Sequence, residues 1–313
     1  GELCSIPAEG TQDIAAAHRG LMLVGEPGTA KTMLSELLSA AISGHSTNTV
    51  QGTAGTTEDM IKYSWNYALL LAKGPSREAL VPSPLYVGME RGILTRFEEI
   101  TRTPAEVQDC LISVLSDKVM NIPELGDEGI LFARPGFNVI GTANTRDKGV
   151  NEMSSALKRR FSFETVQPVG DVALEKRIIL DEAGAMAQSA GISVPLDEDA
   201  ATLLATAYHE LRQGISAEGM RLKKPAAVMS TAEAVSVYYQ TLMSAWYYGG
   251  PEQARHLDER ALAENLMGAV AKESREELAA VREYFTAIVQ KKADRAGGAW
   301  KRFYEAGIRL RQS

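Results

Sequence analysis

The sequence of 313 residues is long for a single hydrophobic core, so its length favours two domains. Its composition, 45% hydrophobic and 23% charged, is that of an ordinary globular protein, and its net charge of −7 disfavours sequence-independent binding to nucleic acid. No apolar run reaches the ~18 residues that a membrane-spanning helix needs. We therefore expect no membrane span and a cytoplasmic protein whose Cys4 and Cys110 are free thiols.

The first half of the chain alternates short apolar runs with helical patterns, an order typical of parallel α/β units. The run Leu21-Met-Leu-Val24 lies between two glycines, and apolar residues at spacings of three and four follow it. These patterns predict strands at residues 21–24, 48–51, 92–97 and 138–142, and helices at residues 32–43 and 103–115.

After Pro168 the strand patterns end and helical patterns follow one another, at residues 172–183, 199–213, 231–248, 258–270 and 275–291. Two of these helices begin with a capping box, Ser230 with Glu233 and Ser274 with Glu277. Gly214 and Gly249 are the predicted C-terminal stops. The sequence thus predicts an α/β domain with a parallel sheet at residues 1–167, an all-helical domain at 168–250 and a helical extension at 251–313.

The segment GEPGTAKT lies between a predicted strand and a predicted helix, which is the context of a phosphate-binding loop. Backbone N–H groups of such a loop point at the anion, Lys31 would reach the outer phosphates, and Thr32 would bind Mg²⁺. The alternative is a turn that precedes Lys-Thr by chance. The candidate nucleotide-binding residues are Gly25, Glu26, Pro27, Gly28, Thr29, Ala30, Lys31, Thr32 and Met33.

Ala30 occupies the position that is glycine in the strict phosphate-loop pattern G-x-x-x-x-G-K-[ST]. Glycine is needed where φ is positive or where a Cβ atom would block the phosphate. As the last residue before the helix, Ala30 is expected to have a near-helical backbone that tolerates a methyl group.

Three further motifs follow the loop: SPLYVGMERGILTRFEEI at residues 83–100, GTAN at 141–144 and ALKRRF at 156–161. The loop itself fits G-x-P-G-x-A-K-[ST] at every fixed position. In this order and spacing, the four motifs resemble those of the MoxR group of AAA+ ATPases, which is related to the dynein-type and magnesium-chelatase AAA modules. The resemblance implies an α/β AAA+ P-loop NTPase core with a parallel sheet, followed by an all-helical lid domain.

By this resemblance, the pair Glu98-Glu99 is the acidic motif of an ATPase. Glu98 is expected to support Mg²⁺ through water, and Glu99 to polarise the water that attacks the γ-phosphate. The chain departs from the family twice here, because the family usually has aspartate in place of Glu98 and an apolar residue in place of Arg96. The alternative is that the two carboxylates are a solvated strand end.

The resemblance also implies that Asn144 is sensor 1, which hydrogen-bonds the attacking water or the γ-phosphate. Arg160 matches the arginine finger, with Arg159 beside it as the second candidate. Because a finger acts across a subunit boundary, the assignment implies a ring with ATP sites between protomers. The local alternatives are an asparagine in an ordinary turn and a basic helix end that complements the helix dipole.

The helical domain resembles the AAA+ lid, but the sensor 2 arginine that the family often carries is missing. The chain has Ser230-Thr231-Ala232 where S-x-R would be expected. Arg221, Lys223 or Lys224 are the candidate substitutes.

Residues 57–82 form an insert between the second strand and Glu98, and the resemblance makes this helix-2 insert a candidate substrate-contacting element. A second loop, residues 121–135, is expected to form the hairpin before sensor 1. Trp65 and Tyr67 lie in the insert, and we expect both to be core residues.

Taken together, the sequence predicts a MoxR-like AAA+ ATPase that uses ATP and Mg²⁺, forms a hexameric ring and remodels a protein partner. The resemblance suggests a protein with a von Willebrand factor A domain as that partner. An ATP-binding assembly scaffold with little turnover is the first alternative, favoured by Glu98, Arg96 and the missing sensor 2 arginine. A nucleic-acid remodelling AAA+ protein is the second alternative, disfavoured by the acidic balance.

Overall fold

The computed structural model describes residues 19–144, 151–225, 229–253, 257–270 and 275–309. The chain divides into two compact units, and the main break falls between Val166 and Gln167. The short segment Pro27–Thr29 groups with the second unit. Each unit is described by itself. Among the described residues, no helix combines the length and the apolar character needed to cross a bilayer.

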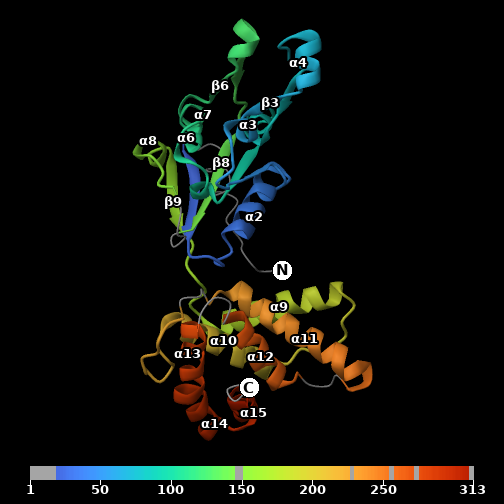
Figure 1. Cartoon of the computed structure of the whole chain (residues 1–313), viewed down its shortest axis with the longest axis vertical. Coiled ribbons are helices and arrows are strands. Elements are labelled where there is room, and N and C mark those ends of the chain that lie inside the picture. Colours follow the sequence, from blue (N-terminus) through green and yellow to red (C-terminus); the bar gives the residue numbers. More distant parts are fainter. Residues whose placement is uncertain (1–18, 145–150, 226–228, 254–256, 271–274, 310–313) are drawn as a thin grey trace. The chain divides into compact units, whose positions relative to one another are not determined.

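A five-stranded parallel sheet forms the centre of the first unit, with strand order β2-β5-β8-β1-β9 (Figure 1). The four predicted strands are confirmed with small shifts, and the fifth strand, β9, was not predicted. The strands are β1 (Gly20–Gly25), β2 (Thr49–Gln51), β5 (Leu94–Glu98), β8 (Asn138–Asn144) and β9 (Phe161–Thr165).

Side chains of these strands alternate between two apolar layers, as the period of a strand requires. Leu23, Leu94 and Ile140 face helix α2 (Lys31–Ser43) and pack with its Leu38. The opposite face carries a larger cluster that includes Met22, Phe97 and Val139 and extends to helices α5 (Pro84–Arg91) and α7 (Leu111–Asp117). Both faces of the sheet are therefore covered, as expected for a parallel sheet.

The predicted helix at residues 103–115 is wrong as one continuous element. The chain forms a 3₁₀ turn, η1 (Ile100–Arg102), and then two short helices, α6 (Ala105–Gln108) and α7. Between α6 and α7 the backbone N–H groups of Cys110 and Ile112 bond three residues back instead of four, which breaks the α-helical pattern. Burial raises the pKa of the Cys110 thiol to about 12, so this free cysteine stays protonated. Cys4 lies outside the described residues.

The insert and the hairpin extend from the sheet at the same end of the first unit (Figure 1). Two hydrogen bonds connect them, from Tyr63 Oη to Glu124 Oε2 (3.0 Å) and from Arg77 Nη2 to the carbonyl oxygen of Glu128 (2.9 Å). Trp65 packs against the core, but the prediction of a core Tyr67 is wrong, because its exposed fraction is 70%. The elements are α3 (Glu58–Ile61), β3 (Tyr63–Trp65), α4 (Tyr67–Lys73) and β4 (Leu80–Pro82) in the insert, and β6 (Val119–Asn121), η2 (Pro123–Glu128) and β7 (Ile130–Phe132) in the hairpin region.

The second unit is helical throughout its regular elements, as predicted. One hydrophobic cluster, which runs from Ile179 to Ala306 along the chain, unites its helices. The helices are α9 (Val172–Ser189), α10 (Glu198–Gln213), α11 (Thr231–Gln253), α12 (Glu259–Val270), α13 (Arg275–Tyr284), a π-helical turn (Phe285–Val289), α14 (Gln290–Ala296) and α15 (Gly298–Arg309).

Several predicted helix ends in the second unit were wrong. Gly249 does not stop α11, which continues to Gln253, whereas Gly214 ends α10 with φ 71° as predicted. The helix expected at residues 275–291 is divided by the π-helical turn and ends at Ala296. The capping box at the start of α11 is confirmed, since the Ser230 and Glu233 side chains each bind the other residue's backbone N–H group. Ser274, in the other predicted box, lies outside the described residues.

Candidate nucleotide-binding site

The predicted phosphate loop connects β1 to α2, at the edge of the sheet where the parallel strands end. Gly28 has φ 75°, in the left-handed region that glycine occupies without strain. The prediction of a near-helical Ala30 is wrong, because its backbone is also left-handed, with φ 61° and ψ 25°. The turn into α2 imposes this conformation, which costs a residue with a Cβ atom about 1–2 kcal/mol.

The first turn of α2 offers backbone N–H groups to an anion. Its N-cap, Ala30, makes no side-chain capping hydrogen bond, and its first turn has no acidic residue. Lys31 is nearly buried against the loop, where its Nζ donates to the carbonyl oxygens of Gly25 (3.2 Å) and Glu26 (2.7 Å). An ammonium group beside a helix N-terminus is a combination that suits a phosphate group.

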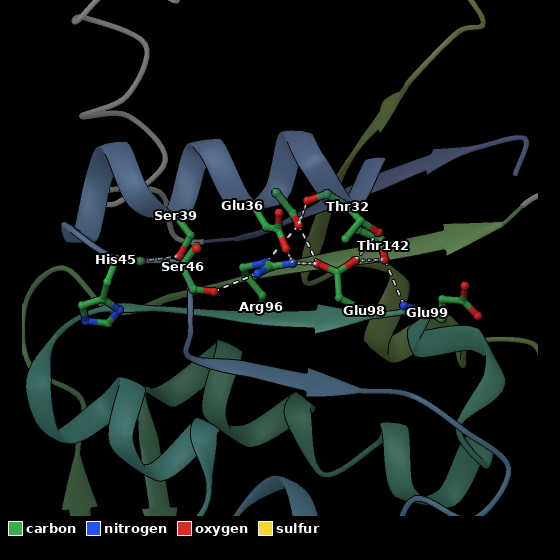
Figure 2. A network of polar contacts seen from close by, with 10 residues as sticks. Thr32, Glu36, Ser39, His45, Ser46, Arg96, Glu98, Glu99 and Thr142 are labelled. Atoms are coloured by element: carbon green, nitrogen blue, oxygen red, sulfur yellow. Dashed lines mark hydrogen bonds and ion pairs between the residues drawn. The ribbon is translucent and has the colours of Figure 1, made fainter. Parts of the chain in front are cut away.

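Glu98 ends β5, and its side chain lies on the sheet face that α2 covers (Figure 2). Its Oε2 accepts hydrogen bonds from Thr32 Oγ1 (3.1 Å) and Thr142 Oγ1 (2.7 Å). Its Oε1 accepts from Ser35 Oγ and from Arg96, whose Nη2 lies 2.7 Å away. The predicted metal residues Thr32 and Glu98 are therefore in direct contact, because β5 lies beside the N-terminal half of α2.

Arg96 has a partner that explains why a charged residue lies in a buried strand. Alternation along β5 places it on the same face as Glu98, and the side chains of both residues are only 4% exposed. The two form a buried ion pair. A second bond, from Nη1 to the carbonyl oxygen of Ser46 (2.8 Å), and an ion pair with Glu36 (3.2 Å) complete the arrangement around the guanidinium.

Glu99 lies immediately after β5, with a left-handed backbone at φ 52°. Its N–H group donates to Thr142 Oγ1 (2.9 Å), which links the two carboxylate residues through one threonine. Its carboxylate lies apart from the Glu98 network (Figure 2) and pairs with Arg102 on the partly exposed side of the chain. This carboxylate is thus outside the hydrogen bonds that hold Glu98 in place.

Asn144 is the last residue of β8 and lies directly opposite Gly25, the first residue of the loop, in the pairing of β8 with β1. The sensor 1 candidate and the start of the phosphate loop are thus neighbours at the same edge of the sheet. Carboxyl ends of parallel strands are the usual place for ligands in α/β sheets.

The two candidate finger arginines lie at the opposite edge of the sheet. Arg160 precedes β9, and its carbonyl oxygen accepts a bond from the N–H group of Gly20 at the start of β1. The five steps from Gly20 to Gly25 span about 16 Å along β1. Arg160 Nε donates to Ser116 Oγ (2.8 Å), whereas the side chain of Arg159 is exposed.

The residues considered for sensor 2 belong to the second unit. Thr231, in the middle of the Ser230-Thr231-Ala232 segment, donates from Oγ1 to Glu175 Oε1 (2.8 Å). Arg221 takes part in a single β-bridge with Ile215, and Lys224 packs against Gly214. Lys223 is exposed between them.

Ser35 and Thr142 were missed by sequence reasoning, although both bind Glu98. Ser35 follows Thr32 by three residues and so shares its helix face, and Thr142 precedes Asn144 by two residues and so shares its strand face. These spacings are present in the sequence. They become informative only when the neighbouring elements are known.

The residues at this edge fit a nucleotide with Mg²⁺. Thr32 Oγ1 donates a hydrogen bond to Glu98, so its lone pairs remain to bind a hard cation, which prefers oxygen ligands. The α2 N-terminus and Lys31 supply the positive end for phosphate oxygens. The chemistry that this arrangement supports is phosphoryl transfer to a polarised water.

Comparison with known proteins agrees with this geometry. Residues 20–161 match the AAA domain of the dynein-related subfamily, and residues 173–311 match the YehL-like AAA+ ATPase C-terminal domain. The uncharacterized protein YehL of Escherichia coli (strain K12) is 49% identical over 296 residues, which cover 94% of this chain and 80% of that relative. An uncharacterized protein of Staphylococcus aureus (strain USA300) is 28% identical over 168 residues, covering 53% of this chain and 62% of the relative.

Solved structures support the fold. NtrX from Brucella abortus in complex with ATP matches with a TM-score of 0.54 and 15% identity, covering 99% of this chain and 69% of NtrX. The same protein with ADP gives 0.55 and 14%, covering 96% and 67%. The predicted fold class, an α/β AAA+ core followed by helices, is thereby confirmed. The chain belongs to the YehL-like family of AAA+ ATPases.

Proposed function

We propose that this protein binds ATP with Mg²⁺ and hydrolyses it, as a MoxR-like AAA+ ATPase. One observation carries the proposal: the phosphate loop, the Thr32–Glu98 contact, Glu99 and Asn144 meet at the carboxyl edge of one parallel sheet. The motif residues that the sequence spreads over more than a hundred positions thus share one location.

Each residue has a role in this proposal. Lys31 and the N-terminus of α2 hold the phosphates, and the remaining loop residues from Gly25 to Ala30 surround them. Thr32 binds Mg²⁺, and Glu98 supports the metal through the Thr32 hydroxyl or through water. Glu99 polarises the attacking water, and Asn144 orients that water or the γ-phosphate. The magnesium ion would neutralise charge on the phosphates during transfer.

The Glu99→Gln variant tests this function directly. Loss of the base should reduce phosphate release from ATP about 10²–10⁴-fold while ATP binding persists. Glu106→Gln is the matched control, since Glu106 is an exposed residue on α6 of the same unit. Release of phosphate by the Glu99→Gln protein at the control's rate would contradict the role of Glu99.

The position of Arg160 supports a finger that acts on a neighbouring subunit. Its own phosphate loop lies at the other edge of the sheet, farther away than an arginine side chain can reach. We therefore propose a ring, with a hexamer as the expected size.

Mixing Arg160→Ala protein with Lys31→Ala protein should restore part of the ATPase activity. The same mixture prepared with Arg159→Ala protein in place of Arg160→Ala protein tests whether Arg159 is the finger instead. Mixed rings that stay inactive would contradict a finger acting between subunits.

A scaffold that binds ATP with little turnover is the second candidate, because the buried Arg96–Glu98 pair could hold the metal residues in one arrangement. Absence of phosphate release by the assembled wild-type protein, with ATP bound, would favour it. A protein client, such as one with a von Willebrand factor A domain, and a cytoplasmic location remain predictions from the sequence. Affinity capture with Glu99→Gln protein and ATP would identify the client.

A further inference from the structure

Arg96 donates five hydrogen bonds to four residues from a position that is almost closed to solvent. Its Nε and Nη2 reach Glu98 Oε1 at 3.1 Å and 2.7 Å, and its Nε also donates to Ser35 Oγ (3.0 Å). The other contacts go to the Ser46 carbonyl oxygen and to Glu36, which is half exposed. A planar guanidinium with fixed donor directions can hold a carboxylate in one orientation far better than a single donor can.

The two oxygens of Glu98 have separate partners. Oε1 is bound by Arg96 and Ser35, and Oε2 is bound by the hydroxyl groups of Thr32 and Thr142 (Figure 2). The two oxygens lie in one rigid plane, so donors on Oε1 also fix the position of Oε2. A quarter turn of the carboxylate about its last bond would take both oxygens away from their donors. The contact with Thr32 therefore depends on what holds Oε1.

We propose that Arg96 is a positioning residue for the metal site: by holding Glu98 Oε1, it keeps Oε2 on Thr32 Oγ1 and so turns the lone pairs of that hydroxyl toward Mg²⁺. Partners of this kind, one step removed from the metal, fix the orientation of the groups that bind it. The inference rests on the proposed ATP site for its metal, but the Arg96–Glu98 dependence is a property of the protein alone.

The first experiment measures the Mg²⁺ concentration that half-saturates binding of a fluorescent ATP analogue to the full chain. Arg96→Met should raise this concentration about 10-fold. Arg96→Lys keeps the charge but has only one nitrogen donor, and should raise it by less. Glu36→Gln removes another partner of Arg96 without affecting Glu98 and should leave it unchanged. Binding measured with EDTA separates a loss of nucleotide affinity from a loss of metal affinity.

Two results would overturn the proposal. An unchanged Mg²⁺ requirement in folded Arg96→Met and Arg96→Lys proteins would mean that Arg96 serves the fold only. A lowered requirement in Arg96→Met with no change in Arg96→Lys would mean that the positive charge opposes the metal and that its geometry is irrelevant.

The second experiment measures unfolding in urea without nucleotide or metal, for Arg96→Met, Glu98→Gln and the double variant. Each single change leaves a buried charge without its partner, so the double variant should lose less than the sum of the two. Additive losses would contradict the pairing. A poorly folding Arg96→Met protein is also covered, because Arg96→Lys then carries the Mg²⁺ titration and the double variant completes the stability cycle. If the wild type binds no ATP with Mg²⁺, the proposed function fails while the cycle still reports on Arg96 and Glu98.

Discussion

The two units of the molecule each bury one glutamate against one arginine. In the first unit Glu98 pairs with Arg96, and in the second unit Glu175 on α9 pairs with Arg212 on α10. All four side chains are at most 7% exposed. Both pairs bring charges out of water, which is costly unless the geometry is good and the remaining atoms are hydrogen-bonded.

The pairs differ in how the carboxylate is used. Arg212 donates to both oxygens of Glu175, at 3.0 Å and 2.7 Å. It also donates to the carbonyl oxygens of Met229 and Val169, so it joins three segments of the second unit. Arg96 reaches only Oε1 of Glu98, and Oε2 is directed to the threonine after the phosphate loop. The Glu175 pair thus holds segments of the second unit together, whereas the Glu98 pair leaves one carboxylate oxygen clear of the arginine, as the proposed metal site requires.

The largest expected effect concerns the pair in the second unit. Glu175→Gln should lower the free energy of unfolding by about 3–5 kcal/mol, because the Arg212 guanidinium then stays buried without its counter-charge. Urea unfolding measures this loss. Lys176→Gln is the control: it breaks the neighbouring, more exposed pair with Glu198 and should cost about 0–1 kcal/mol. Equal losses in both variants would show that burial does not distinguish the two pairs.

Binding of nucleotide should stabilise the folded protein, and variants of the two units should differ in whether they keep this gain. ATP with Mg²⁺ at a hundred times its Kd should raise the free energy of unfolding by about 2.7 kcal/mol. Lys31→Ala should abolish this gain, whereas Glu175→Gln should lower the baseline and retain it. Thermal unfolding with and without ligand measures both. A gain that also disappears in Glu175→Gln would contradict the assignment of a purely structural role to the second pair.

Two threonines allow a matched comparison of the carboxylates. Thr142 donates to Glu98 and Thr231 donates to Glu175, at 2.7 Å and 2.8 Å. Replacing either threonine by valine should cost about 1–3 kcal/mol of stability, since an oxygen of a buried carboxylate loses a donor. Only Thr142→Val should also raise the Mg²⁺ requirement for nucleotide binding. An equal rise in Thr231→Val would contradict the distinction.

The smallest expected effect concerns the entrance to the site. Ala30→Gly should raise the free energy of unfolding by about 1 kcal/mol, because glycine adopts the left-handed backbone at position 30 without strain. Ala40→Gly, within the same helix, should lower it by about 1 kcal/mol. Chemical unfolding of the two variants gives the comparison, and a loss of stability in Ala30→Gly would argue against strain at the loop.

The sequence predicted the core strands well, because a buried parallel strand is a short apolar run with clear boundaries. It did not predict β9, whose outer residues are polar or exposed, as in Ser162 and Glu164. The helix expected at residues 103–115 and the stop expected at Gly249 were wrong for a related reason. Local patterns indicate where a helix is favourable, but packing decides where it breaks or continues.

The candidate site shows the same division. The phosphate loop, the acidic pair and the asparagine that ends β8 were recognisable because each is a short motif whose chemistry lies within a few residues. Ser35 and Thr142 were not, because their importance depends on which strand lies beside α2. Arg96 was noticed only as an anomaly. Its partner is two residues away in the sequence, yet without the covering helix nothing indicated that both side chains are buried.

The amino-acid sequence by itself therefore determined the order of an α/β unit followed by a helical unit, the nucleotide-binding loop, and the chemical groups near that loop. These features depend on local periodicity and on short motifs. Strand order and helix placement decided the rest: the left-handed turn at Ala30, the contact of Thr32 with Glu98, the neutralisation of Glu98 by Arg96, and the separation of Arg160 from the loop. These features depend on distances between residues that are remote in the chain, or on burial by other elements, and only the folded arrangement sets those.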